Sequence, residues 1–106
     1  MPEAVGPDVV ETPVVLCCLL WAKPGQAEGL SGYEDRVLAF VPDYQGTVRE
    51  RAISDGLEGR ANEVQIYVFP NQAALDGYLA DTRRTALAEE RDRVIERTEL
   101  FPVRLA

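Results

Sequence analysis

Histidine is absent from this sequence of 106 residues. Its absence excludes Ser-His-Asp and Cys-His catalysis, haem held by an imidazole, and zinc or iron sites built on histidine. The two cysteines, Cys17 and Cys18, are adjacent, so they cannot supply the spaced thiolates of a metal cage. The glycine-rich motifs that cradle phosphates are missing too. We therefore expect a protein that needs no metal and no cofactor.

Long apolar runs and an excess of basic residues are also absent. No segment approaches the roughly 20 apolar residues that cross a bilayer, and the net charge is −7. An acidic chain repels phosphate backbones and anionic lipids, so we expect neither nucleic acid nor a membrane as a partner. The first residues carry acids and prolines where a secretion signal has positive charge and then an apolar stretch. These features predict a cytoplasmic location.

The composition is that of one globular domain. Hydrophobic residues make up 46% of the chain and charged residues 27%, and a length of 106 residues suits a single core. Pro2, Gly6, Pro7 and Pro13 interrupt any regular element near the start. We predict a flexible N-terminal tail over residues 1–12 and a single domain over residues 13–106.

Four segments predict β-strands. Residues 14–22 are apolar on both faces, and residues 63–69 carry large side chains on both faces, so these two segments are expected at the centre of a sheet. Residues 47–54 are polar, and residues 99–105 contain Pro102, which cannot donate to a neighbouring strand. The polar segment and the proline-containing segment are therefore expected at the edges.

Two helical segments alternate with these strands. Ser31 and Glu34 have the spacing of a capping box. The apolar stripe of this helical segment consists of Tyr33, Val37, Phe40, Val41 and Tyr44, and Pro42 tightens or ends the helix near Val41. Asn71 is the expected cap of the second helix, which breaks near Ala80 and restarts at Asp81. The mixed charges of residues 89–97 indicate a solvated helix face.

The order β-α-β-β-α-β predicts a four-stranded antiparallel sheet in the order 4-1-3-2, with both helices on one face. The opposite face is then bare, and exposed apolar area costs about 25 cal/mol per Å². On residues 63–69 that face is either the Val64, Ile66, Val68 set or the Gln65, Tyr67, Phe69 set. We expect a second copy of the chain to cover it, which makes the protein a homodimer.

Three stretches resemble the dimeric α+β barrel superfamily, which has the ferredoxin-like fold and includes the antibiotic-biosynthesis monooxygenases. They are LLWAKPG, GYEDRVLAFVPDYQG and VFPNQAALDGYLADTRR, and the likeness covers nearly all of residues 13–105. The resemblance implies a ferredoxin-like α+β domain that dimerises into an α+β barrel. The superfamily also holds haem degraders, isomerases and small domains of no assigned activity.

The resemblance further implies a cavity between sheet and helices in each protomer. Side chains that are expected to point there and to bind a small apolar or aromatic ligand are Trp21, Tyr33, Tyr44, Gln65, Tyr67, Tyr78, Arg83 and Arg84. Three interpretations stay open: a cofactor-independent monooxygenase-like enzyme acting on a small aromatic molecule, a dimer that binds small molecules without catalysis, and a dimer kept for assembly or housekeeping.

Overall fold

The structure is a computed structural model that describes residues 12–106. The chain forms the strands β1 (Val14–Ala22), β2 (Thr47–Ile53), β3 (Glu63–Phe69) and β4 (Ile95–Pro102). The helices are α1 (Ala27–Leu38), α2 (Gln72–Leu79), α3 (Thr82–Thr85) and α4 (Ala88–Val94), with the short 3-10 helices η2 (Val41–Tyr44) and η3 (Leu57–Gly59). The predicted N-terminal tail lies almost wholly outside the described residues.

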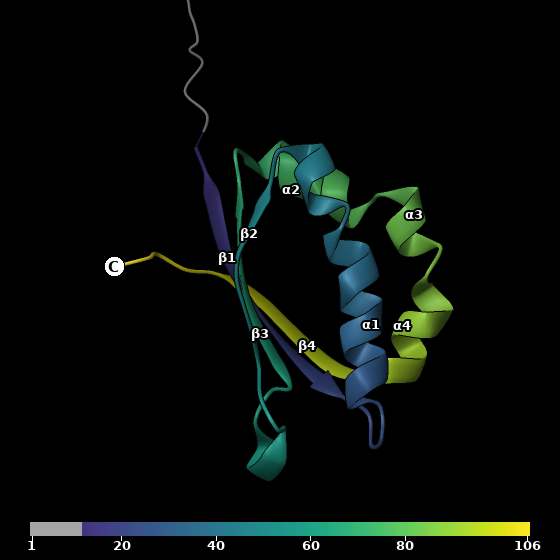
Figure 1. The fold of residues 1–106 in the computed structure, drawn as a ribbon. Coiled ribbons are helices and arrows are strands. Elements are labelled where there is room, and N and C mark those ends of the chain that lie inside the picture. Colours follow the sequence, from purple (N-terminus) through teal and green to yellow (C-terminus); the bar gives the residue numbers. More distant parts are fainter. Residues whose placement is uncertain (1–11) are drawn as a thin grey trace, which may run out of the picture.

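The four strands form one antiparallel sheet in the order β2-β3-β1-β4. This order is the predicted 4-1-3-2 order seen from the other edge, and it confirms a ferredoxin-like α+β fold. Figure 1 shows all four helices on one side of the sheet and none on the other. None of the helices among residues 12–106 is long and apolar enough to cross a membrane.

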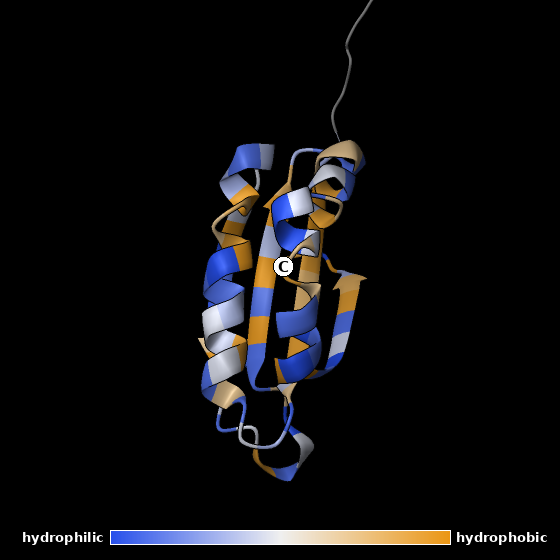
Figure 2. Ribbon diagram, turned by 90° about the vertical axis from the view of Figure 1, so that its right-hand side faces the viewer, coloured by the Kyte–Doolittle hydropathy of each residue, from blue (hydrophilic) through white to orange (hydrophobic). Residues whose placement is uncertain are grey.

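The alternation of side chains along the central strands decides which set faces the helices. In β3 the residues Glu63, Gln65, Tyr67 and Phe69 are buried, whereas the residues between them are partly exposed. Cross-strand pairing puts these buried residues on the same face as Leu16, Cys18 and Leu20 of β1. The Val64, Ile66, Val68 set therefore lies on the open face. Figure 2, seen from the helix side, shows hydrophilic and hydrophobic residues alternating along the strands.

The start of α1 differs from the prediction. The helix begins at Ala27, so Ser31 lies within it and no capping box forms with Glu34. The Ser31 hydroxyl instead donates to Glu63 Oε2 at 2.5 Å. Within this longer helix Glu34 lies on the buried stripe with Leu30, Tyr33, Val37 and Leu38. The helix ends at Leu38, and Tyr44 belongs to η2.

The second helical segment is broken twice. The predicted caps are confirmed, because the side chain of Asn71 accepts from Ala74 N and that of Asp81 accepts from Arg83 N, each at 2.8 Å. A further break separates α3 from α4. β4 then follows α4 directly and starts at Ile95, four residues before the predicted strand. Ile95 is buried and pairs with Ala22, which explains the earlier start.

Candidate functional site

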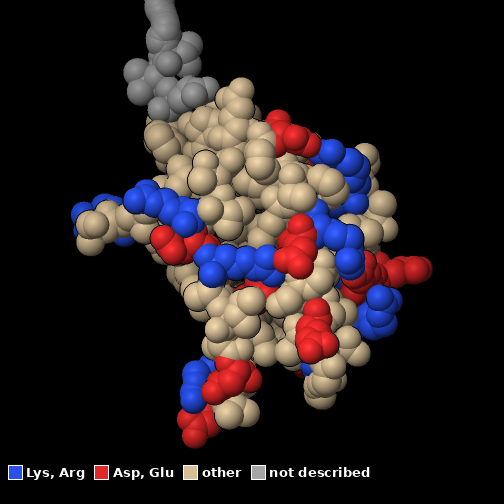
Figure 3. Space-filling view, viewed as in Figure 1, with Lys and Arg blue, Asp and Glu red and all other residues tan. Residues whose placement is uncertain are grey.

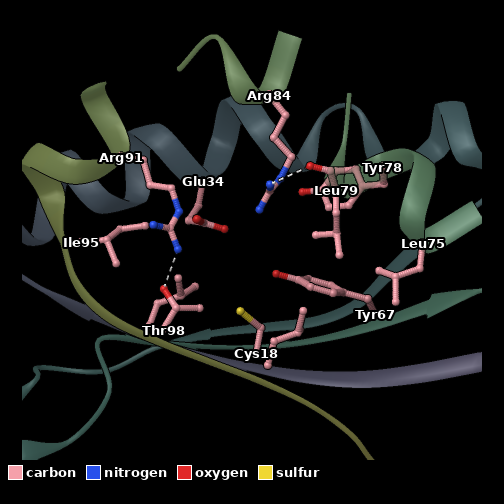
Figure 4. Close-up of a pocket in the computed structure, with 12 residues that line it drawn as sticks. Cys18, Glu34, Tyr67, Leu75, Tyr78, Leu79, Arg84, Arg91, Ile95 and Thr98 are labelled. Carbon is pink, nitrogen blue, oxygen red and sulfur yellow. Dashed lines mark hydrogen bonds between the residues drawn. The ribbon is translucent and has the colours of Figure 1, made fainter. Parts of the chain in front are cut away.

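A cavity of about 40 Å³, partly open to solvent, lies between the helices and the sheet. By its size it holds a few water molecules. Figure 4 shows polar side chains from both layers pointing toward it. Its lining consists of Cys18, Leu20, Glu34, Tyr67, Leu75, Tyr78, Leu79, Arg84, Arg91, Ile95, Thr98 and Leu100.

Glu34 is the only carboxylate on this lining, and just 4% of the residue is exposed. Burial raises the pKa of its carboxyl group, and the hydrogen bond from Gln65 Nε2, at 3.1 Å, offsets part of that rise. A carboxylate whose pKa is raised in an apolar cavity is a better proton acceptor than an exposed one. Glu34 is therefore the candidate base of the site.

Arg84 supplies an unmet donor to the same cavity. Its Nε is buried and has no hydrogen-bond partner among the described residues. Its Nη1 donates to Leu79 O at 3.3 Å, and its guanidinium carbon lies 5.1 Å from the centre of the Tyr78 ring. A buried donor without a partner is costly and is rare in folded proteins. The arrangement suits an oxygen atom of a bound molecule.

Arg91 is the second cation on the lining. Its Nη2 donates to Thr98 Oγ1 at 3.2 Å, across the cavity edge formed by β4. Within residues 12–106 neither Arg84 nor Arg91 makes an ion pair, whereas Arg36, Arg51, Arg60, Arg83 and Arg97 all do. The positive charges of Arg84 and Arg91 at the cavity are thus not paired directly with a carboxylate of residues 12–106.

On the surface of the molecule, in contrast, basic and acidic side chains are intermixed, as Figure 3 shows for one face.

A chain of hydrogen bonds joins the cavity to the surface through Gln65, which is fully buried. Gln65 Nε2 donates to Glu34 Oε1 and, at 2.9 Å, to Glu63 Oε1, while the Tyr67 hydroxyl donates to Gln65 Oε1. Arg51 donates to both oxygens of Glu63, at 2.8 and 2.9 Å. Glu63 therefore holds the Gln65 amide in place from behind the cavity.

Burial sets the protonation of the other cavity groups. It raises the pKa of Tyr78 to about 12 and that of Cys18 to about 11, and it raises the pKa of Tyr67 well above its ordinary range. All three are therefore neutral near pH 7. A neutral buried thiol is a poor nucleophile, so the chemistry of the site does not centre on Cys18.

Three of the eight predicted residues, Tyr67, Tyr78 and Arg84, line the cavity together. Gln65 lies behind it and acts through its hydrogen bonds. Tyr33 is buried in the core but does not reach the lining.

The expectation that Trp21 points into this cavity is wrong. Trp21 alternates with Leu20, so its side chain lies on the open face of the sheet, opposite Arg97 of β4. There its indole N–H donates to Gly59 O at 2.9 Å, and the Arg97 guanidinium lies 4.2 Å from the ring centre.

Tyr44 and Arg83 belong to a separate cluster at the junction of η2 and α3. The Tyr44 hydroxyl donates to Asp81 Oδ2 at 2.5 Å, and Arg83 donates to Asp81 and, at 2.9 Å, to Asp43. The hydrogen bonds from Arg83 and Tyr44 lower the pKa of Asp81. This cluster fixes the break between α2 and α3 and does not reach the cavity.

Glu34, Arg91, Cys18 and Thr98 were not among the predicted site residues. The spacing from Ser31 predicts Glu34 as the capping-box partner at the start of the helix, and not as a residue of its buried face. The spacing Leu30, Tyr33, Glu34, Val37, Leu38 was the available signal, since it continues an apolar stripe through one carboxylate. No group of three His, Cys, Asp or Glu side chains suited to a metal ion occurs among residues 12–106.

Comparisons with known proteins show the fold and no specific activity. No family model matches the chain, and no curated protein matches it. Among solved structures, a protein of Bacteroides thetaiotaomicron that is provisionally described as an antibiotic biosynthesis monooxygenase has a TM-score of 0.69 at 15% identity, covering 91% of each chain.

Two further structures show the same fold. A NIPSNAP family protein of unknown function from Agrobacterium tumefaciens has a TM-score of 0.70 at 17% identity, and the match covers 91% of this chain and 90% of that one. A dimeric protein of unknown function with a ferredoxin-like fold from Bacteroides fragilis has a TM-score of 0.65 at 10% identity, covering 88% and 96%. The chain is thus a ferredoxin-like α+β domain with an internal cavity that polar and apolar side chains line together.

Proposed function

We propose that the chain is a homodimeric, monooxygenase-like enzyme that acts on a small, largely apolar aromatic molecule without a metal or an organic cofactor. The observation that carries this proposal is that a buried carboxylate, Glu34, and the Nε of Arg84, which has no partner among the described residues, line one cavity. The first group accepts a proton and the second stabilises the anion that remains.

The chemistry begins with removal of a proton from a hydroxyl group or from an activated CH₂ group of the bound ring. The Arg84 N–H donates to the resulting oxyanion in a low-dielectric site, where a fixed donor is worth more than in water. An electron-rich anion of this kind can react with O₂ directly. Conversion of a CH₂ group and O₂ to a C=O group and water balances atoms and electrons without a further reductant. The fold shared with a monooxygenase-like protein supports this reaction class.

Binding of an aromatic ring requires the cavity to enlarge, because about 40 Å³ holds only a few waters. The chain from residue 82 to residue 93 covers the cavity and contributes Arg84 and Arg91, and none of its side chains is fully buried. Leu100, at the edge of the cavity, is 39% exposed. We expect this covering segment to move outward when a ligand enters, since it gives up little buried apolar area.

The homodimer forms through the open face of the sheet. Val64, Ile66 and Val68 of β3 lie there with Cys17 and Leu19 of β1, and all five side chains are only partly buried in one chain. A second copy that packs its own open face against this one removes that apolar surface from water. The dimeric ferredoxin-like protein of Bacteroides fragilis is similar in fold and supports this arrangement.

A dimer kept for assembly is the second candidate function. The small volume of the cavity favours it, because the open face alone then accounts for the fold. The remaining alternative is a dimer that binds small molecules in the same cavity as the proposed enzyme but does not catalyse a reaction.

Titration with phenol, followed by NMR, tests the site. We expect shifts in residues around the cavity, and weaker binding by Arg84→Met but not by Arg83→Met, which removes the neighbouring arginine outside the cavity. Oxygen uptake is then measured with phenols and ring ketones in the presence of EDTA. Binding of phenol without oxygen uptake would support a dimer that binds small molecules without catalysis. Absence of binding, with a dimer in solution, would leave the assembly alternative.

A further inference from the structure

The orientation of the Gln65 amide is fixed by its neighbours. An amide group has an acceptor end and a donor end, and the two carboxylates beside Gln65 both require the donor end. Glu63 is the stronger constraint, because burial favours its neutral form but Arg51, Ser31 and Gln65 together hold its pKa below the ordinary value. An ionised Glu63 accepts only, so the Gln65 NH₂ group, 2.9 Å away, must donate to it.

This orientation determines what Tyr67 offers to the cavity. With its NH₂ group used by Glu63 and Glu34, Gln65 turns its oxygen to the Tyr67 hydroxyl, and an amide oxygen can only accept. The single hydroxyl proton of Tyr67 is therefore committed to Gln65. The Tyr67 oxygen is left with lone pairs toward the cavity, beside the Glu34 carboxylate, and Cys18 lies next to it (Figure 4).

The two arginines of the segment after α2 have the reverse polarity. Arg84 and Arg91 are donors only, and Arg84 Nε has no acceptor among the described residues. A ligand group placed between Arg84 and these acceptors must then donate its proton to Glu34 or Tyr67 and accept from Arg84. A hydroxyl group does both, whereas an ether or a ketone only accepts.

We infer that Gln65 is a positioning residue that sets the hydrogen-bond polarity of the cavity and so selects ligands that carry a hydroxyl group over ethers and ketones of the same shape. The inference rests on the proposed function, because it concerns ligands of that same cavity. Gln65 then determines ligand specificity without contacting the ligand. The Glu63 carboxylate, which pairs with Arg51, fixes the orientation of the Gln65 amide.

A double-mutant cycle with phenol and methoxybenzene as probes tests the polarity. With Gln65 present, Tyr67→Phe should weaken phenol binding by about 2- to 10-fold, the effect of one hydrogen bond, and leave methoxybenzene unchanged. In the Gln65→Met background the Tyr67 hydroxyl proton is free to turn toward the cavity. Tyr67→Phe should then weaken the binding of methoxybenzene. Loss of methoxybenzene affinity on Tyr67→Phe while Gln65 is present would overturn the inference.

A second measurement needs no ligand and covers the case in which Gln65→Met folds poorly. In the unaltered protein the two side-chain amide protons of Gln65 should show stronger NOEs to Glu34 and Glu63 than to the Tyr67 ring. Arg51→Met leaves Glu63 an acceptor only and should keep these NOEs, whereas Arg51→Met/Glu63→Gln, in which the side chain at position 63 can also donate, should allow the reversed amide. An amide that faces Tyr67 in the unaltered protein would overturn the inference. If the NOEs are as expected and neither probe binds, the proposed function fails and the selection of ligands fails with it.

Discussion

At the residue scale, two buried glutamates that share one amide have opposite protonation behaviour. Glu63 receives hydrogen bonds from Arg51, Ser31 and Gln65, and these outweigh its burial, so its pKa is lowered. Glu34 receives one such bond, from Gln65, and burial dominates, so its pKa is raised. The number of donors around each carboxylate, and not its depth, therefore separates a structural anion from a candidate base.

The pH dependence of stability should carry the sign of the raised Glu34 pKa. Between the ordinary value near 4.5 and the raised value, the folded state binds the proton that the unfolded chain has released, so stability falls as pH rises. Glu34→Gln should flatten this decline in the free energy of unfolding, measured with urea from about pH 5 to about pH 8. A variant that is less stable than the unaltered protein at the upper end would contradict this.

Removal of Arg51 should leave Glu63 as an unpaired buried charge, because the Glu63 side chain is only 1% exposed. We expect Arg51→Met to cost about 3–5 kcal/mol in the free energy of unfolding near pH 7. The double variant Arg51→Met/Glu63→Gln should recover most of that loss, since the charge is then gone. Equal stabilities of the single and double variants in urea would show that Glu63 is not held as an anion.

The sequence indicates which residue types surround the cavity better than it indicates their roles. Tyr67, Tyr78 and Arg84 could be predicted from their positions on elements that converge in this fold. Glu34 could not, because a carboxylate three residues after Ser31 indicates a capping box, whereas the helix in the structure starts at Ala27. Trp21 was misplaced because neighbouring residues of a strand face opposite sides of the sheet, and Leu20 is the residue that faces the helices.

At the element scale, β1 carries apolar side chains on both faces of the sheet. Cys18 is buried against the cavity, and Cys17, its neighbour, lies on the open face and is partly exposed in one chain. Both thiols are free, and burial raises the pKa of each. The reactivity of Cys18 therefore depends on access to the inside of the protomer, and the reactivity of Cys17 depends on whether the open face of the sheet is covered.

Thiol labelling of single-cysteine variants should distinguish these two dependences. In Cys17→Ser the remaining Cys18 should react slowly at every protein concentration, because it lies inside the protomer. In Cys18→Ser the remaining Cys17 should react slowly at high concentration and faster on dilution, as the proposed dimer dissociates. The rates are followed with a chromogenic disulfide reagent. Fast labelling of Cys17 that does not depend on concentration would place it outside any interface.

The segment after α2 shows where periodicity fails as a predictor. Its apolar spacing predicted one helix interrupted near Ala80, and the Asp81 cap was correctly anticipated. The second break, at Ala86 and Leu87, has no glycine or proline to signal it. It allows α4 to pack beside α1 and to deliver Val94 and Ile95 to the core, which is a tertiary requirement that local spacing does not encode.

At the scale of the whole molecule, the order of elements predicted the sheet correctly because short connections and right-handed crossovers leave few topologies. The edge strands followed from one polar segment and one proline. The same reasoning predicts a dimer, since the helices cover only one face of the sheet (Figure 1).

Light scattering should give a mass of twice the 11.7 kDa chain mass at micromolar concentration. Ile66→Asp, on the open face, should shift the protein to a monomer. Ile53→Asp is the matched control, because Ile53 is an exposed isoleucine outside that face, and it should leave the mass unchanged. A monomeric mass for the unaltered protein would contradict the covered open face.

The central claim is that the cavity takes a proton from an acidic, apolar ring through Glu34. It is tested most directly by the absorption spectrum of 4-nitrophenol bound to the protein at a pH where the free compound is mainly protonated. We predict that the phenolate band appears on binding and that Glu34→Gln removes it while 4-nitrophenol still binds. A bound compound that stays protonated in the unaltered protein, or a phenolate band of equal strength in Glu34→Gln, would contradict the claim.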